Sequence, residues 1–322
     1  MLIFRVNFRQ CCQELGCKTI CNFKMMNFTN KSRANYAIVL LIALTGIVFG
    51  TCKTISESEP GQSLGIASIP NLRDMGGYKT SDGATIARGL VFRSNQLYNI
   101  SASDMLLLTK LNLKNDFDLR TTAERNSQPD ELPDGVNNIW LDVMADLPSS
   151  GPANLNALLS DPLKANIELG NGKAEELFKA AYRHCISLPS AVVAYRELFL
   201  ALGDENQLPV LFHCATGKDR TGWAAAAFLT FLGVPMEKVK EDYMRSNDYI
   251  LPMCDTLIQR FVAAGGSPSI PLAILGVKEE YLAAAFDEMQ TKYGSIENYF
   301  SEGLGINADQ QAAMRNLYLK NE

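Results

Sequence analysis

The segment that most constrains the fold joins a short buried strand to a buried helix through a tight polar loop. The apolar run Pro209–Cys214 (PVLFHC) has the length and residue types of a strand covered on both faces. The stretch Thr221–Leu232 (TGWAAAAFLTFL) is rich in alanine and apolar on nearly every helical face. A buried strand that leads directly into a buried helix indicates an α/β layer structure.

The rest of the chain repeats this alternation. Strands are predicted at Gly89–Leu97, Leu113–Leu119 and Asn138–Val143. Helices are predicted at Ser101–Leu111, where Ser101 and Asp104 form a capping pair, and at six later segments: Ala174–Ile186, Ser190–Leu202, Met236–Ser246, Asp255–Ala264, Lys278–Tyr293 and Ala308–Leu319. We therefore expect an α/β fold with a central, largely parallel sheet flanked by helices and a helix-rich C-terminal half.

The N-terminal 52 residues are predicted to be an export signal. Ala37–Phe49 is an apolar run preceded by Lys31 and Arg33. It is shorter than the roughly 20 residues of a transmembrane helix, and a positive stretch before a short apolar core is typical of export signals. Cys52 resembles the lipid-modified cysteine of bacterial lipoprotein signals, so an envelope lipoprotein and a secreted protein both stay open.

This assignment also sets the domain organisation. Met25 and Met26 stand at a more natural distance before the apolar core than Met1, so residues 1–24 are interpreted as an extension ahead of the true start. Residues 53–65 are polar, contain Pro, Gly and Ser, and are predicted to be a linker. Residues 66–322 are expected to form the folded catalytic domain.

Charge and residue counts exclude several classes of function. Residues 1–53 carry seven Lys or Arg and one acidic residue, which leaves 23 basic and 34 acidic residues, a net charge of −11, for 54–322. So acidic a domain is not expected to bind nucleic acid through its phosphates. With only His184 and His213 in the chain, a multi-histidine metal site is excluded. Three body cysteines, Cys185, Cys214 and Cys254, cannot all pair, so no disulfide framework is expected there.

The loop after the buried strand has the chemistry of an anion site built around a thiolate. Backbone N–H groups at the start of a helix lack helical partners and, with the helix dipole, favour an anion. The predicted phosphate-binding residues are those of the loop, Ala215, Thr216, Gly217, Lys218, Asp219 and Arg220. Cys214 should have a depressed pKa there, Arg220 can grip two phosphate oxygens, and Thr221 can offer its hydroxyl to the sulfur.

Other interpretations of this segment fit less well. A nucleotide-binding P-loop needs glycine where Phe212 stands and Ser or Thr where Asp219 stands. A histidine-dependent triad would need a base beside the nucleophile, but adjacent strand residues point to opposite faces, so His213 is predicted to support the loop backbone. The second Cys-x5-Arg pair, Cys254 and Arg260, lies in a helical pattern without glycine.

These residues resemble the signature of the cysteine-dependent tyrosine phosphatases, His-Cys-x5-Arg-Thr/Ser. The longer run His213-Cys-Ala-Thr-Gly-Lys-Asp-Arg-Thr-Gly222 is similar to the bacterial branch that acts on both phosphotyrosine proteins and phosphoinositides. So are Asn71–Gly77 (NLRDMGG), Asp118–Arg125 (DLRTTAER) and Asp242–Asn247 (DYMRSN). The resemblance implies the phosphatase α/β fold, no metal or other cofactor, and a phosphocysteine intermediate on Cys214.

The residue that acts as general acid is not identified by this resemblance. Many relatives carry the acid on a Trp-Pro-Asp loop, and no such tripeptide occurs here. Asp118, at the end of a predicted strand, is the first choice, although pairing with Arg73, Arg120 or Arg125 is an equal alternative for it. Asp219, inside the loop, is the second choice, and Asp142 and Asp146 come third. Lys218 either adds a second cation that favours substrates with several phosphates or is a solvated lysine. The region Ile250–Tyr293 either covers the site as a lid or packs in the core.

The expected function is therefore hydrolysis of phosphate monoesters, with a phosphorylated protein or a phosphoinositide as partner. A pseudophosphatase that captures phosphorylated ligands without turnover is the alternative, and a rhodanese-like sulfurtransferase a further one. Contact with a membrane is expected only through a lipid on Cys52.

Overall fold

The computed structural model describes residues 59–147 and 158–320. The chain divides into two units, Met1–Glu57 and Ser58–Glu322. The predicted export signal and Cys52 lie outside the described residues, as do residues 53–58 of the predicted linker.

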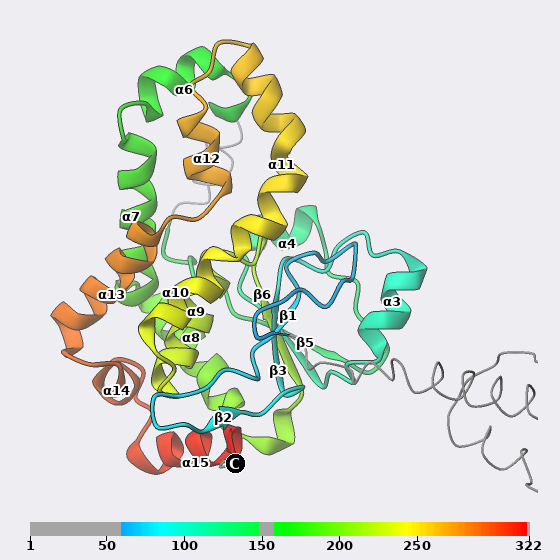
Figure 1. Ribbon diagram of the computed structural model, residues 1–322, viewed down its shortest axis with the longest axis vertical. Coiled ribbons are helices and arrows are strands. Elements are labelled where there is room, and N and C mark those ends of the chain that lie inside the picture. The colour runs from blue at the N-terminus through cyan, green and yellow to red at the C-terminus, as the bar shows by residue number, and fades with distance from the viewer. Residues whose placement is uncertain (1–58, 148–157, 321–322) are drawn as a thin grey trace, which may run out of the picture. The chain divides into compact units, whose positions relative to one another are not determined.

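A five-stranded sheet forms the centre of the second unit (Figure 1). Its order is β1-β3-β6-β4-β5, with strands at Arg73–Asp74 (β1), Val91–Ser94 (β3), Asn115–Asp118 (β4), Asn137–Trp140 (β5) and Val210–His213 (β6). The pairs β3–β6, β6–β4 and β4–β5 are parallel, and only the edge strand β1 is antiparallel. The predicted, largely parallel sheet is confirmed. A separate antiparallel pair joins β2 (Thr85–Ile86) to β7 (Leu319–Lys320), which the sequence patterns did not predict.

Alternation along the central strand β6 divides its side chains between two layers. Val210 and Phe212 belong to the large hydrophobic core, and Leu211 belongs to a smaller one on the other face. His213 follows in the same alternation, on the face of Leu211. The side chain of His213 is therefore directed away from the face on which Cys214 joins the large core, as predicted.

Helices cover the sheet and account for most of the C-terminal half. The helix after β6, α9 (Arg220–Phe231), is buried over nearly its whole length because its alanines allow close packing against the sheet and neighbouring helices. Among the described residues, further helices are α3 (Ala102–Thr109), α4 (Thr122–Ser127), α6 (Pro162–Leu169), α7 (Lys173–Ser187), α8 (Pro189–Leu202), α10 (Met236–Met244), α11 (Ser246–Ala263), α12 (Ser269–Leu275), α13 (Glu279–Tyr293), α14 (Ile296–Asn298) and α15 (Ala308–Tyr318). Single helical turns also occur at Glu205–Gln207 and Tyr299–Gly303.

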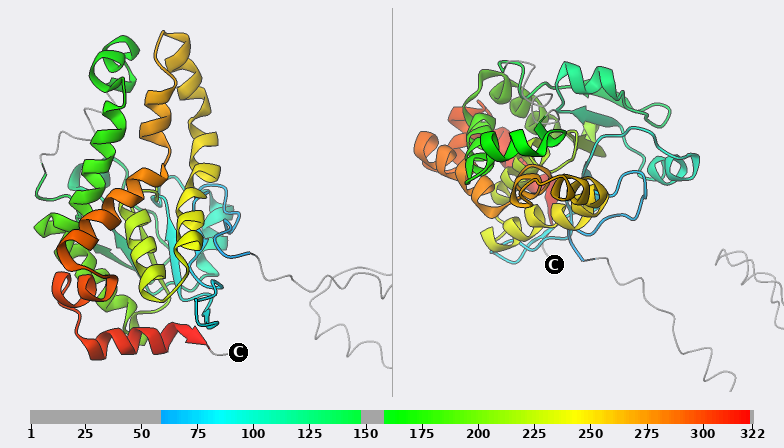
Figure 2. Two further views of the ribbon diagram at one scale, coloured as in Figure 1. Left: turned by 60° about the vertical axis from the view of Figure 1, so that its left-hand side comes forward. Right: turned by 90° about the horizontal axis from the view of Figure 1, so that it is seen from above.

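Four helices form a helical lobe that extends beyond the sheet: α6, α7, α11 and α12 (Figures 1 and 2). They pack on one another through α6–α7, α7–α12, α6–α12 and α11–α12 contacts. The predicted helix Asp255–Ala264 is in fact longer, because α11 begins at Ser246 and continues through Pro252. The region Ile250–Tyr293 is thus divided between the lobe and α13, which packs against α7.

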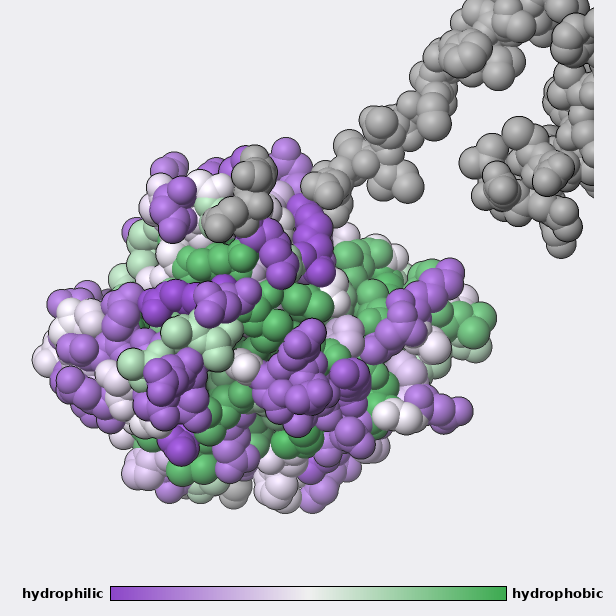
Figure 3. Space-filling view, turned by 90° about the horizontal axis from the view of Figure 1, so that it is seen from below, coloured by the Kyte–Doolittle hydropathy of each residue, from purple (hydrophilic) through white to green (hydrophobic). Residues whose placement is uncertain are grey.

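The surface mixes hydrophilic and apolar side chains. Figure 3 shows apolar side chains at the end of the molecule formed by α3, where Leu106 and Leu107 are exposed. Among the described residues, no single helix has both the length and the apolar character needed to span a membrane, although α7 and α8, bent by 62° at their junction, pass the same test as a pair.

Candidate active site

The loop between β6 and α9 lies just before the N-terminus of a buried helix. Helix α9 begins at Arg220, and the preceding Asp219 makes no side-chain capping hydrogen bond. Among the described residues, no protein acceptor is found for the N–H groups of residues 215–220. Unpaired N–H groups at the start of a helix are a ready site for an anion.

Each of the first five loop carbonyls accepts a hydrogen bond, four of them from residues distant in the chain and that of Cys214 from its neighbour His213. The five pairs are Cys214 O with His213 Nδ1 at 3.2 Å, Ala215 O with Gln96 N at 3.1 Å, Thr216 O with Asn71 Nδ2 at 3.0 Å, Gly217 O with Arg93 Nη2 at 2.7 Å, and Lys218 O with the Tyr182 hydroxyl at 3.4 Å. Because a peptide's C=O and N–H point in opposite directions, fixing the carbonyls outside turns the N–H groups inward.

Gly217 is the residue whose backbone requires glycine. Its φ is +70°, in the left-handed region, and a Cβ there would collide with the backbone carbonyl of Ser94. The carbonyl of Gly217 is held by Arg93, which also pairs with Asp242 at 2.6 Å. Asp242 pairs in turn with Arg73 at 2.7 Å, so the motifs around residues 71–77 and 242–247 support the loop from behind.

Cys214 is buried at the start of the loop and is reduced. Burial by itself raises the pKa of the thiol, but the Arg220 guanidinium and the hydroxyl and N–H of Thr221 outweigh burial. The pKa of Cys214 is therefore below its ordinary value. For the buried Cys185 the burial outweighs the lowering by Tyr195 and Arg220 and raises the pKa of the thiol to about 12.

Arg220 is oriented by a carboxylate that the sequence interpretation did not single out. Its Nη1 and Nη2 each lie 2.7 Å from a carboxylate oxygen of Glu124. Glu124 is fixed by a capping box at the start of α4, in which its side chain accepts from the N–H and hydroxyl of Thr121. The spacing Thr121-x-x-Glu124 is a capping signal in the sequence and could have drawn attention to this residue.

Asp118 is fully buried and paired on both of its oxygens. Arg120 bonds Oδ1 through Nε at 2.8 Å and Oδ2 through Nη2 at 2.9 Å, and Arg125 contacts Oδ2 at 2.8 Å. Its side chain is 0% exposed. The structure therefore corresponds to the paired-carboxylate alternative for Asp118, and this burial favours Asp219 as the acid to propose.

Asp219 is the accessible carboxylate of the loop, with its side chain 25% exposed. Oδ1 accepts from the Tyr182 hydroxyl at 2.8 Å and from Lys218 Nζ at 3.0 Å. Asp142 and Asp146 bond backbone N–H groups of Met144 and Ser190 instead. Of the candidate acids, Asp219 is the one that lies in the phosphate loop itself.

Lys218 is buried, not solvated. Its Nζ donates to the carbonyl of Gly276 at 3.0 Å as well as to Asp219, and it lies 4.9 Å from the ring centroid of Phe178. Phe178 belongs to α7 and Gly276 ends α12. Lys218 therefore connects the loop to two helices of the helical lobe.

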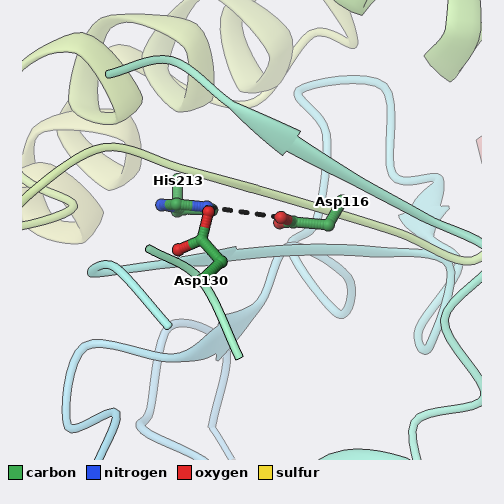
Figure 4. Close-up of side chains that lie close together, drawn as sticks. All are labelled: Asp116, Asp130 and His213. Atoms are coloured by element: carbon green, nitrogen blue, oxygen red, sulfur yellow. Dashed lines mark ion pairs between the residues drawn. The ribbon is translucent and has the colours of Figure 1, made fainter. Parts of the chain in front are cut away.

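His213 lies behind the loop among carboxylates (Figure 4). Its Nε2 is 3.4 Å from Asp116 Oδ2 and 3.4 Å from Asp130 Oδ2, and 4.0 Å from Asp118 Oδ1. Burial opposes the charged ring, but Asp116 and Asp130 outweigh it, so the pKa of His213 is raised well above its ordinary value. The second Cys-x5-Arg pair, Cys254 and Arg260, lies within α11, as predicted.

A depressed-pKa thiol, a clamped arginine and inward N–H groups at the carboxyl end of a parallel strand define a cysteine-based phosphatase. Comparison with known proteins agrees, because residues 64–320 match the tyrosine phosphatase family. The chain belongs to this family and is a phosphatase that acts on phosphate monoesters.

Two relatives are matched by this chain over most of their own length. The Mycobacterium tuberculosis protein named triple specificity protein phosphatase PtpB is 30% identical over 274 residues, which covers 77% of this chain and 96% of that one. A Cupriavidus necator protein named as a tyrosine-protein phosphatase is 28% identical over 249 residues, which covers 77% and 86%. The crystal structure of P. aeruginosa TpbA, at 17% identity, covers 57% of this chain and 91% of that one, and its TM-score of 0.26 is too low to bear on the fold.

Proposed function

We propose that Cys214 is the nucleophile, Arg220 and the N–H groups of residues 215–220 bind the phosphate, and Asp219 is the general acid and base. The observation that supports this assignment is the loop itself, whose carbonyls accept hydrogen bonds from outside the loop while the N–H groups of residues 215–220 have no acceptor among the described residues. His213 and Thr221 support the loop and the thiolate.

In the first step the Cys214 thiolate attacks phosphorus and the bond from phosphorus to the leaving oxygen breaks. The equatorial oxygens are held by Arg220 and the loop N–H groups, whose orientation precedes substrate binding. Asp219 gives its proton to the leaving oxygen, so that the alcohol or phenol departs neutral.

In the second step water attacks the phosphocysteine. The Asp219 carboxylate takes a proton from that water, the sulfur–phosphorus bond breaks, and Cys214 departs as a thiolate. Inorganic phosphate is released and the enzyme returns to its starting protonation state. No step requires a metal or an organic cofactor.

The proposed substrates are phosphotyrosine proteins and phosphoinositides. Support comes from the Gly217-Lys218-Asp219-Arg220 run, which resembles the dual-activity branch, and from a relative named for triple specificity. Lys218 acts on such substrates through Asp219 and the loop conformation, since its amine is buried. A panel of phosphotyrosine peptides, phosphoserine peptides and phosphoinositides would rank these classes.

We also propose that the protein is exported, either secreted or anchored in the envelope by a lipid on Cys52. The support is the sequence alone, namely a positive stretch before a short apolar core and a cysteine just after it. Metabolic labelling with a fatty acid, compared between the natural chain and Cys52→Ser, would distinguish the two. Label that is lost with Cys52 indicates the anchor, and export without label indicates secretion.

Turnover of p-nitrophenyl phosphate tests the assignment of the nucleophile. We expect no turnover in Cys214→Ser, full turnover in the matched variant Cys254→Ser, and no effect of a chelator. Mass spectrometry of an acid-quenched reaction should find one phosphoryl group on Cys214. Affinity for phosphorylated ligands without turnover would instead indicate a pseudophosphatase, and thiosulfate turnover without phosphatase activity would indicate a sulfurtransferase.

A further inference from the structure

One of the five donors behind the loop is a titratable side chain, the imidazole of His213. Of the five loop carbonyls, four accept from a backbone amide, an asparagine amide, an arginine and a tyrosine, and Cys214 O accepts from the imidazole of His213. A carbonyl oxygen only accepts, so this contact exists only while Nδ1 carries a proton. The end of the loop that carries the nucleophile therefore depends on the state of His213.

The surroundings of the ring require protons on both nitrogens. Nε2 faces Asp116 Oδ2 and Asp130 Oδ2, each at 3.4 Å, and ionised carboxylates accept only. Nδ1 faces the Cys214 carbonyl. A neutral imidazole has a single N–H and would leave one nitrogen lone pair against an oxygen, whereas the imidazolium donates from Nδ1 and turns a positive N–H at Nε2 toward the two carboxylates.

The balance of charges around the ring also favours a protonated, positively charged His213. The charged groups around the ring are Asp116 and Asp118 on β4, Asp130 after α4, and the guanidinium groups of Arg120 and Arg125. Three carboxylates against two guanidinium groups leave one negative charge. A buried, unbalanced charge is strongly unfavourable, and a positive His213 cancels it.

We propose that Asp116 and Asp130 are positioning residues of the phosphatase: they keep His213 as an imidazolium, which fixes the Cys214 carbonyl and thereby the nucleophile. This inference rests on the proposed role of Cys214. Both carboxylates face His213, whose side chain lies on the opposite face of the sheet from Cys214, so they are argued to act through His213 and not on the substrate.

A metal ion is the competing occupant of the same cluster. The ligand atoms of Asp116, Asp130 and His213 all lie within 4.8 Å of one another. The two oxygens that face the ring are already engaged, since Asp116 Oδ2 accepts from Asn138 Nδ2 at 2.8 Å and Asp130 Oδ2 from Arg120 Nη2 at 2.6 Å. A divalent cation would also lie beside the Arg120 guanidinium, so the imidazolium is the favoured occupant.

The chain offers a direct test because it contains only two histidines, His184 and His213. In protein labelled with ¹⁵N-histidine, His184→Gln assigns the remaining ring. We expect both nitrogens of His213 to stay protonated from about pH 6 to about pH 8.5, well past the ordinary histidine pKa near 6.5. A neutral His213 ring at pH 7.5 overturns the proposal, and so does loss of the Nε2 proton on adding one equivalent of Zn²⁺.

The variants Asp130→Asn and Asp116→Asn test the consequence for the nucleophile. Each should bring the His213 titration into the measured range and raise the midpoint for alkylation of Cys214 by about one pH unit, in a Cys254→Ser background. The control is Asp134→Asn, which removes the same charge from an exposed position nearby. Unchanged midpoints in folded Asp130→Asn contradict the proposal.

These readouts separate this inference from the proposed function. Ring titration and alkylation need no turnover, so they remain informative if the phosphatase assignment fails. If either aspartate variant does not fold, the measurement on the His184→Gln protein still decides the state of His213. In folded variants we expect kcat to fall about tenfold with a smaller change in KM, because the nucleophile is affected more than phosphate binding.

Discussion

Glu124 binds both terminal nitrogens of Arg220, with two N–O distances of 2.7 Å. This parallel arrangement fixes the plane of the guanidinium as well as its position. Since Thr121 fixes Glu124 in turn, Arg220, the residue proposed to bind phosphate, is aligned in the absence of substrate. Because the side chain is already ordered, less conformational entropy is lost on reaching the transition state.

Removing the carboxylate should therefore impair catalysis without abolishing it. We expect Glu124→Ala to lower kcat/KM for p-nitrophenyl phosphate by about 10² and Glu124→Gln by less, since the amide still accepts one hydrogen bond. The exposed Glu237→Gln is the matched control and should retain wild-type kinetics. Wild-type kcat/KM in Glu124→Ala would show that Arg220 does not need this clamp.

The same pair predicts a pH dependence of stability. Burial disfavours the charged carboxylate, but Arg220 outweighs burial and lowers the pKa of Glu124 from 4.5 to about 2. A depressed folded-state pKa stabilises the protein above the ordinary value, and that contribution is lost as the pH falls from about 4.5 to about 2. Urea unfolding of wild type and Glu124→Gln should thus give free energies that converge over this window. A constant difference would exclude the linkage.

Replacing Asp219 by asparagine should lower turnover, whereas replacing Asp118 by asparagine should lower stability. Asp219→Asn should slow turnover by about 10² on an alkyl phosphate, which needs its leaving oxygen protonated, and by less on p-nitrophenyl phosphate. Asp118→Asn disturbs a buried ion pair and should lower the free energy of unfolding by about 3 kcal/mol. If Asp118→Asn stays fully stable but loses activity on alkyl phosphates, Asp118 is the acid after all.

Two glycine-to-alanine variants distinguish the cost of a positive φ from the cost of a steric clash of the new Cβ. Gly217 and Gly83 both have positive φ, +70° and +93°, but a Cβ at Gly217 collides with the Ser94 carbonyl, whereas nothing lies within 4 Å at Gly83. We expect Gly83→Ala to cost about 1 kcal/mol and stay active. Gly217→Ala should shift the loop and lose phosphate turnover. Equal kinetics in the two variants would refute this view of the loop.

The loop could be predicted from sequence because its parts are contiguous. A buried strand, a glycine-containing turn and an apolar helix follow one another, and each has a local signal. The position of His213 also followed from local geometry, since strand residues alternate between faces. The layer structure was predictable for the same reason, as alternating strands and helices have few stable arrangements.

The residues that contact the loop were not predictable, because local sequence patterns do not determine the order of the strands in the sheet. Four distant segments contribute such residues, namely Asn71, Arg93, Glu124 and Tyr182. The arginine partners of Asp118 were not predictable for the same reason. Asp118 ends a strand, as predicted, but only the tertiary structure shows that Arg120 and Arg125 pair with its two oxygens.

The place of β6 in the sheet bears on when activity appears during folding. β6 is paired on one side with β3 and on the other with β4, and in both pairs His213 aligns with a residue from much earlier in the chain, Ser94 or Asp118. Such long-range pairs form slowly, since a large loop must close first. A fragment that contains the Cys-x5-Arg segment but lacks either neighbouring strand would be inert, and the nucleophile acquires its reactivity only when distant parts of the chain have met.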